Sequence, residues 1–277
     1  MTKLEYTFKS DVLFKMLFVK YPHLLKRLVS VLLGIRPESI EHFETINTEM
    51  PPEEIGKKFC RLDINMIVDG KRVNLEIQVE DEGNYPERSL FHWARDYSSA
   101  LPSGKNYSSL PKTIVSSILG FILFDCDEVH SEFQPLEVNR YTPLTDKMSL
   151  HYFELPKLPK VDYINPNSEK DLWLALFNAE TEEELIKIEG LGVPVMNEAL
   201  KAYRHVSTTD EFKYLEKLRA KTRHDEAQAL FNAERRGESR SDEKWQEAIS
   251  DILSNKGVGE EQIRLRLADL QAKLAEK

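Results

Sequence analysis

The sequence predicts an α/β fold in which a central mixed sheet is flanked by helices and followed by a helical C-terminal region. Residues 58–80 alternate polar and apolar side chains around an Asp-Gly turn, which indicates a β-hairpin. A helix is expected over about 86–100, and the apolar, β-branched run at 113–124 is typical of a strand covered on both faces. A strand–helix–strand crossover makes its outer strands parallel, whereas hairpin strands are antiparallel, so the sheet is mixed.

Two helices are expected before the hairpin. Ser10 can cap a helix that begins at Asp11, where an acidic side chain interacts favourably with the helix dipole. Tyr21-Pro22 ends that helix, Pro22 suits the first turn of the next one, and Gly34 is placed to close it.

Beyond residue 126 the pattern changes. Short strands are expected at about 133–138 and 148–155, and charged helical segments follow from about 168. We therefore predict an α/β domain over residues 1–155 and a mostly helical region over 156–277. The last segments have the pattern of a solvated or self-associating helix pair, so the C-terminal helices are the expected surface for any homo-oligomer.

The composition indicates a folded protein of the cytoplasm. Hydrophobic residues make up 41% of the 277 residues, enough for a sizeable core. No segment approaches the roughly 18–20 apolar residues that span a bilayer, so no membrane partner is expected. Charges at Lys9, Asp11 and Lys15 argue against a signal peptide. We expect Cys60 and Cys126 to be reduced core residues, because two cysteines are too few for a disulfide scaffold or a zinc cluster.

The net charge of −9 is unevenly distributed. Residues 1–125 carry 16 basic and 17 acidic side chains, so most of the negative charge lies in the remainder. Nucleic-acid-binding proteins usually carry a basic surface. The sequence therefore predicts only modest non-specific affinity for nucleic acid.

The hairpin brings two acidic side chains together. If Asp69-Gly70 forms a two-residue turn, Asp63 lies directly opposite Glu76. Apolar and polar residues then separate onto opposite faces, with Ile67 a partial exception, so the register is well specified. The polar face carries Arg61, Asp63, Asn65, Asn74, Glu76 and Gln78.

Two opposing carboxylates repel one another, because their Cβ atoms lie only about 4.5–5.5 Å apart. A divalent cation between them would offset that repulsion, and Mg²⁺ or Mn²⁺ prefers hard oxygen ligands of this kind. Alternatively, Arg61 lies diagonal to Glu76 and pairs with one acid on a solvated face. The residues alone leave both interpretations open.

Five segments in the predicted order carry a resemblance to a known family. The chain resembles the PD-(D/E)XK nuclease family transposases, or Rpn-type recombination-promoting nucleases, over about residues 5–125, with a looser match in the helical tail. The resemblance implies a restriction-endonuclease-like core, metal-dependent hydrolysis of DNA with Mg²⁺ or Mn²⁺, and an association with recombination or transposition. The segments are DVLFK (11–15), RLD (61–63), EIQ (76–78), RSLFHWARDY (88–97) and GKNYSSLPK (104–112).

The resemblance also implies residue roles. Asp63 resembles the metal-binding acid of the first catalytic strand, Glu76 resembles the second ligand, and the Ile77 carbonyl would complete the protein's share of the metal ligands. Gln78 stands where the wider superfamily has lysine. Glutamine can orient water and donate hydrogen bonds, but it supplies no positive charge. Leu62 replaces the proline of the superfamily's name, at a position that points into the core.

Other residues are candidates for accessory contacts. Asp11 and Lys15 lie one helical turn apart, a spacing that usually indicates a surface ion pair. In the family this helix approaches the site, so Asp11 could reach the metal through water and Lys15 could reach a phosphate. Tyr107 and Lys112 flank a loop that could contact the nucleic-acid backbone.

Three basic residues, Arg88, His92 and Arg95, share one face of the helix expected at 86–100. The stripe is either a solvated or partner-facing surface or a set of phosphate contacts, with Arg88 as the candidate. Nothing near His92 in sequence orients its ring, which argues against a general base. Trp93 and Tyr97 are expected in the core.

Two other functions are compatible with the sequence. Gln78 in place of lysine and the acidic net charge favour a weak or inactive nuclease fold that binds DNA or a protein partner. Alternatively, the helical tail is the functional part and the core is its scaffold. Cleavage specificity, and the choice between DNA and RNA, do not follow from the residues.

Overall fold

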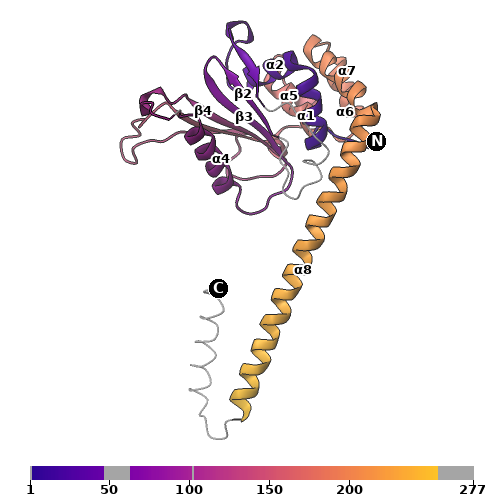
Figure 1. Ribbon diagram of the computed structural model, residues 1–277. Coiled ribbons are helices and arrows are strands. Elements are labelled where there is room, and N and C mark those ends of the chain that lie inside the picture. Colours follow the sequence, from indigo (N-terminus) through magenta and orange to yellow (C-terminus); the bar gives the residue numbers. More distant parts are fainter. Residues whose placement is uncertain (1, 47–62, 102, 255–277) are drawn as a thin grey trace. The chain divides into compact units, whose positions relative to one another are not determined.

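The computed structural model describes residues 2–46, 63–101 and 103–254. The chain forms two compact units, Met1–Ala220 and Lys221–Lys277. The first unit contains a six-stranded sheet with helices packed on its faces, which confirms the predicted α/β fold (Figure 1). Cys60, Arg61 and Leu62, which enter the sequence predictions, lie outside the described residues.

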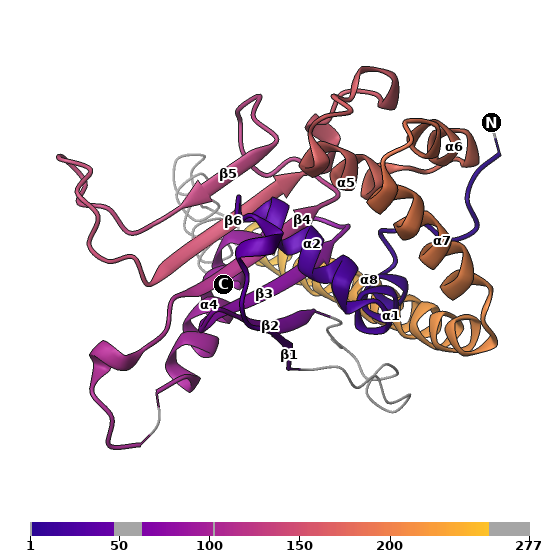
Figure 2. The same cartoon turned by 90° about the horizontal axis from the view of Figure 1, so that it is seen from above.

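The sheet is mixed, as predicted. Its strand order is β1-β2-β3-β4-β6-β5, so β1 and β5 form the two edges (Figure 2). The pairs β3–β4 and β4–β6 are parallel and the other three pairs are antiparallel. The strands are β1 (Phe43–Thr45), β2 (Ile64–Val68), β3 (Lys71–Gln78), β4 (Thr113–Leu119), β5 (His130–Phe133) and β6 (Met148–Glu154).

The first two helices follow the local sequence signals. Ser10 Oγ accepts a hydrogen bond from the Leu13 N–H at 3.2 Å, so Ser10 caps the first helix. Pro22 opens the second, and Gly34 has a φ of 66° just beyond its end. The described α-helices are α1 (Asp11–Lys20), α2 (Pro22–Leu32), α4 (Tyr85–Ser99), α5 (Glu169–Asn178), α6 (Glu182–Gly190), α7 (Pro194–Thr208) and α8 (Asp210–Ser254). The short 3₁₀ helices are η1 (Pro37–Ser39), η2 (Tyr107–Ser109), η3 (Leu155–Lys157) and η4 (Val161–Tyr163).

The β2–β3 hairpin has the predicted register. Asp69 and Gly70 have φ angles of 47° and 76°, the pair of left-handed conformations that a type I′ turn requires. The ladder runs from this turn to its last pair, Ile64 opposite Leu75. The helix α4 then connects β3 to the parallel strand β4, which confirms the predicted crossover.

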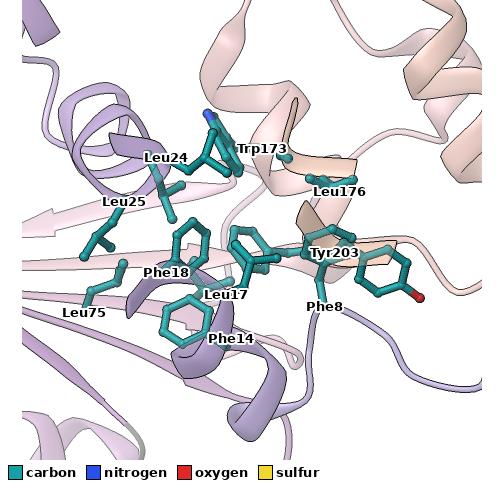
Figure 3. Packing of buried hydrophobic residues seen from close by; sticks show 14 of the residues in the cluster. Phe8, Phe14, Leu17, Phe18, Leu24, Leu25, Leu75, Trp173, Leu176 and Tyr203 are labelled. Atoms are coloured by element: carbon teal, nitrogen blue, oxygen red, sulfur yellow. The ribbon is translucent and has the colours of Figure 1, made fainter. Parts of the chain in front are cut away.

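One hydrophobic core joins the sheet to helices from both ends of the first unit (Figure 3). The ring of Phe18 in α1 lies 6.0 Å from that of Trp173 in α5, and Phe8 stacks on Tyr203 of α7 at 4.5 Å. All four side chains are buried. Because α5 and α7 share this core with α1, the predicted boundary between residues 155 and 156 lies inside the first compact unit.

Helix α4 packs on the other face of the sheet. Tyr85, the first residue of α4, is buried against Val115, Leu119 and Tyr152, and Trp93 packs on the same cluster. Trp93 and Tyr97 stack at 4.9 Å, yet both remain half-buried rather than fully enclosed in the core.

The strand β4 is shorter than the apolar run that predicted it. It ends at Leu119, not at 124, because the chain leaves the sheet at Gly120. Ile122, just beyond, is 60% exposed. Cys126, expected in the core, is exposed in the same loop. Hydrophobicity alone did not predict where the strand ends.

The strand β5 covers 130–133 rather than the predicted 133–138. Pro135 lacks the N–H that would extend the ladder. The chain instead forms a turn in which the Leu144 N–H donates to the Pro135 carbonyl at 2.9 Å. The strand predicted at 148–155 and the helices predicted from about 168 are confirmed as β6 and α5–α8 within the described residues.

Helix α8 begins in the first unit and continues beyond Lys221. Phe212 and Leu215 are buried in the core of the first unit. From Lys221 most described side chains are exposed, in agreement with a solvated helix. No helix among the described residues has the length and apolar composition needed to span a bilayer.

Candidate functional site

A row of polar side chains lies on the face of the sheet where α4 packs. Strand β3 places Asn74, Glu76 and Gln78 on this face, because alternate residues of a strand point the same way. Asn74 and Glu76 are only 7% and 8% exposed. Asp63 precedes β2 and is half-buried. Extending the hairpin register by one residue places Asp63 opposite Glu76, so the predicted register brings the two acids together.

Two asparagine amides donate hydrogen bonds to Asp63. The Nδ2 groups of Asn65, at 3.1 Å, and of Asn74 both donate to Asp63 Oδ2. Asn74 Nδ2 also donates to Asn65 Oδ1 at 2.9 Å, and these two residues face one another in the ladder. The three side chains therefore form one network. Its neutral donors stabilise the Asp63 carboxylate and leave its charge in place.

Glu76 receives a hydrogen bond from helix α4. The Tyr85 hydroxyl donates to Glu76 Oε1. Tyr85 is 2% exposed, and burial, followed by the neighbouring Glu76 charge, raises the pKa of the Tyr85 hydroxyl well above its usual 10.0. The hydroxyl is therefore protonated, and acts as a donor, throughout the neutral range.

The Gln78 amide interacts with the chain that follows β3. Its Nε2 group donates to the backbone carbonyl of Glu80 at 2.9 Å. The side-chain carbonyl of a glutamine also accepts hydrogen bonds, so Gln78 can orient a water molecule through Oε1. In this arrangement Gln78 is better suited to accept from water than to donate to a phosphate.

The direction of the Ile77 carbonyl follows from the β3–β4 ladder. The Arg72 N–H donates to the Lys112 carbonyl, and the Gln78 carbonyl accepts from the Gly120 N–H. Arg72 and Gln78, like the other even-numbered residues of β3, thus direct their backbone groups towards β4. Ile77 lies between two of these residues, so its carbonyl points towards β2, the side on which Asp63 lies.

Asp11 and Lys15 belong to α1, on the sheet face opposite α4. Asp11 Oδ2 accepts a hydrogen bond from Arg219 Nε at 2.8 Å, and Ser10 Oγ donates to Glu216 at 2.6 Å. Lys15 is only 4% exposed, so it does not sit in the solvated surface pair that the i, i+4 spacing suggested. The Asp11–Arg219 ion pair joins residues that local sequence patterns cannot connect.

Arg88 lies beside Tyr85, whose hydroxyl donates to Glu76. Its guanidinium lies 5.7 Å from the centroid of the Tyr85 ring and 3.4 Å from the Glu82 carboxylate. Arg95, the third residue of the predicted stripe, is exposed, whereas His92 is half-buried. Of the stripe, Arg88 is therefore the residue that the structure brings next to the polar row.

Tyr107 and Lys112 lie away from Glu76, before the start of β4. Lys112 precedes Thr113, which pairs with Arg72, whereas Glu76 pairs with Ser117. Lys112 therefore lies five residues before Ser117, the partner of Glu76, which is about 16 Å along the strand. Tyr107 is 78% exposed in the loop before β4. These two residues are placed for contacts away from the acidic pair.

The oxygen donors near Asp63 and Glu76 fit a hard divalent cation. Among the described residues, no three His, Cys, Asp or Glu side chains gather as a metal-binding group. A metal here therefore depends on two carboxylates, backbone or amide carbonyls and water, which is a ligand set that Mg²⁺ accepts. Asn74 Oδ1 is buried and has no hydrogen-bond partner among the described residues, so it adds a neutral oxygen to this set.

Sequence reasoning assigned no role to Asn65, Asn74 or Tyr85. The asparagines were visible as a facing pair on the polar side of the hairpin, one step closer to the turn than the acids. Tyr85 had a weaker signal, as the first residue of the helix that follows β3. Its contact with Glu76 depends on how α4 packs, which no local pattern specifies.

The comparison with protein families assigns the chain. The family model for the PD-(D/E)XK nuclease family transposases matches residues 8–233, well beyond the segment of about 5–125 over which the motifs are recognisable. No curated protein and no solved structure matches the chain. The matched range includes the polar row on β2 and β3, the helix α4 and the helices α5–α7. The chain therefore belongs to the PD-(D/E)XK nuclease family transposases.

Proposed function

We propose that the chain is a metal-dependent endonuclease that hydrolyses DNA phosphodiester bonds, of the recombination-promoting type. The observation that supports the proposal is the hairpin register: continued by one residue beyond Ile64 and Leu75, it would put Asp63 opposite Glu76, in a chain of this nuclease family. Asp63, Glu76 and the Ile77 carbonyl would hold Mg²⁺ or Mn²⁺. Two negative charges held side by side on a half-buried face favour the binding of a cation over an empty site.

Each residue then has a defined task. A divalent metal held by Asp63, Glu76 and the Ile77 carbonyl would supply an activated water and would neutralise charge on the phosphate. Gln78 orients the attacking water through its side-chain carbonyl. Arg88 offsets negative charge that develops on the phosphate, since its guanidinium lies 5.7 Å from the ring of Tyr85, whose hydroxyl donates to Glu76. Asp11 and Lys15 have no task in this proposal, because α1 lies on the opposite face of the sheet, where Asp11 pairs with Arg219 and Lys15 is buried.

Cleavage of supercoiled plasmid by the full chain tests the proposal. Nicking should require Mg²⁺ or Mn²⁺ and should fail with Ca²⁺. Both Asp63→Ala and Glu76→Ala should abolish it, because each removes a ligand and its charge. Glu44→Ala, which removes an exposed acid from β1, is the matched control and should cut like the wild type. Asp63→Ala activity equal to the wild type would assign any cleavage to another site.

A second candidate is a catalytically weak or inactive nuclease fold that binds DNA or a protein. The observation that favours it is the Gln78–Glu80 hydrogen bond, which engages the amide at the position where the superfamily has a cationic lysine. A wild type that binds DNA without nicking it under any metal would support this candidate. Gain of nicking in Gln78→Lys would then identify the missing cation as the cause.

A further inference from the structure

Tyr85 is fixed in place by the side chains around its ring. Its ring packs edge-on against Phe121 and Tyr152, with centroids 5.9 and 6.2 Å away, and the guanidinium of Arg88 lies 5.7 Å from its centroid. The side chain is 2% exposed. Packing on several sides therefore sets the position of the hydroxyl independently of Glu76.

The helix that carries Tyr85 is also held at this point. Ser89, one turn along α4, shares a hydrogen bond of 2.5 Å with the Tyr152 hydroxyl. Across the sheet, Glu76, Ser117 and Tyr152 occupy one row of β3, β4 and β6. The start of α4 is thus bonded to both ends of this row. Tyr85 bonds to Glu76 on β3, and Ser89 bonds to Tyr152 on β6.

A glutamate side chain has three rotatable bonds, and holding it in one rotamer has an entropic cost when a metal binds. A fixed donor on Oε1 removes much of that freedom in advance. We infer that Tyr85 is a positioning residue that orients Glu76 for the divalent metal. The inference rests on the proposed function, since it assumes that Glu76 is a metal ligand. Hydrogen-bonding partners of metal ligands typically change metal affinity about 10- to 100-fold when they are removed.

The test is Mn²⁺ binding to the full chain, measured from the electron paramagnetic resonance signal of free Mn²⁺. Tyr85→Phe keeps the ring and its packing and removes only the donor. It should weaken Mn²⁺ binding about 10- to 100-fold. Tyr203→Phe is the matched control, because it removes a hydroxyl from a buried tyrosine in the core on the other face of the sheet, one that donates to the Tyr6 carbonyl. Tyr203→Phe should bind Mn²⁺ like the wild type.

A double variant shows whether Tyr85 acts through Glu76. In a Glu76→Gln background, adding Tyr85→Phe should cause no further loss of Mn²⁺ affinity, because the oriented ligand is already absent. Thermal unfolding without metal, measured on the same proteins, separates affinity from a loss of stability.

The outcomes distinguish this inference from the proposed function. Wild-type affinity in Tyr85→Phe, together with weakened binding in Glu76→Gln, would overturn the positioning role and leave the metal site intact. Equal losses in Tyr85→Phe and Tyr203→Phe would show a general effect of removing a buried hydroxyl and would also overturn it. A wild type that binds no Mn²⁺ would contradict the proposed metal site itself.

Discussion

Asn74 donates from one amide group to both Asp63 and Asn65. Asn74→Ala removes both hydrogen bonds and leaves the half-buried Asp63 carboxylate with fewer donors. The free energy of unfolding should fall by about 1–3 kcal/mol without metal. Urea denaturation of the metal-free protein measures this free energy. Asn139→Ala, in an exposed turn, should stay within about 0.5 kcal/mol of the wild type.

A charged replacement at the same position tests the electrostatics of the site. Asn74→Asp adds a third carboxylate beside Asp63 and Glu76, so repulsion raises the pKa of the new acid in the folded state. The metal-free variant should be less stable than the wild type at pH 7 and should recover part of the loss as the pH falls, because protonation removes the added charge. Mn²⁺ should stabilise it more than it stabilises Asn74→Ala. Equal responses of the two variants to Mn²⁺ would argue against a cation site.

Local sequence patterns predicted some of the site residues but could not predict those whose contacts depend on tertiary packing. The Asp-Gly turn predicts the register, which the structure shows from Val68–Lys71 to Ile64–Leu75, and the same register extended by one residue predicts Asp63 opposite Glu76. Tyr85 could not be assigned this way, because its contact depends on the packing of α4 over β3. The same holds for Asp11 and Arg219, whose ion pair requires the tertiary fold to bring α1 to the start of α8.

At the scale of elements, β4 ends where it meets the chain after β3. A Cβ atom on Gly120 would lie 2.9 Å from the Val79 carbonyl oxygen and 3.1 Å from the Val79 Cα. The Gly120 N–H also donates to the Gln78 carbonyl at 2.8 Å. The close approach of two backbones, which only glycine permits, explains why an apolar run of twelve residues predicted too long a strand.

Gly120→Ala should therefore shift the end of β3 as well as that of β4. The expected loss of stability is about 1–3 kcal/mol, because backbone atoms must move to admit the methyl group. Gly190→Ala is the control: it lies in α6 with nothing within 4 Å of the added Cβ, and should be neutral or stabilising by up to about 1 kcal/mol. Chemical denaturation of both variants checks the pair. If Gly120→Ala were as stable as Gly190→Ala, the close approach of Gly120 to Val79 would not be what requires a glycine at this position.

The edge pair β5–β6 should respond to acid. His130 Nε2 lies 3.0 Å from His151 Nδ1, and His151 Nε2 lies 2.9 Å from Ser149 Oγ. Burial lowers the pKa of His151 from 6.5 to about 4, and burial together with Lys170 lowers the pKa of His130. The charged groups that face this pair are Lys112 of the loop before β4, Glu132 of β5 and Lys170 of α5.

The sign of the pH effect follows from the direction of these shifts. The unfolded chain binds a proton on His151 from about pH 6.5 downwards, whereas the folded chain does not until about pH 4. The stability contributed by His151 is thus complete above pH 6.5 and falls by at most about 3 kcal/mol on acidification to pH 4. His151→Gln should flatten this part of the stability profile.

At the scale of the whole molecule, the α/β class was predictable because it depends on element order, which is local. The extent of the first compact unit was not. The sequence predicted a boundary after residue 155, where the residue pattern changes, but the helices that follow complete the core around α1 and α2. Helix α5 buries six consecutive residues (172–177), whereas α6 and α7 bury one apolar face each. Amphipathic helices do not reveal from sequence which surface they cover.

Truncation separates the two possible boundaries. A chain of residues 1–155 lacks α5, and with it Leu172, Trp173, Leu174, Leu176 and Phe177, all fully buried. At about 1.5–3 kcal/mol for each buried side chain, α5 alone contributes about 7–15 kcal/mol, which is comparable to the whole stability of an ordinary domain. This chain should not fold. A chain of residues 1–220 keeps the core intact and should unfold cooperatively, with a circular dichroism spectrum of mixed α/β content. A folded 1–155 chain would show instead that α5–α7 pack on an already stable core.

Light scattering of the 1–220 chain tests whether the C-terminal helices self-associate. Loss of a homo-oligomer relative to the full chain would assign self-association to these helices, and an unchanged mass would contradict it.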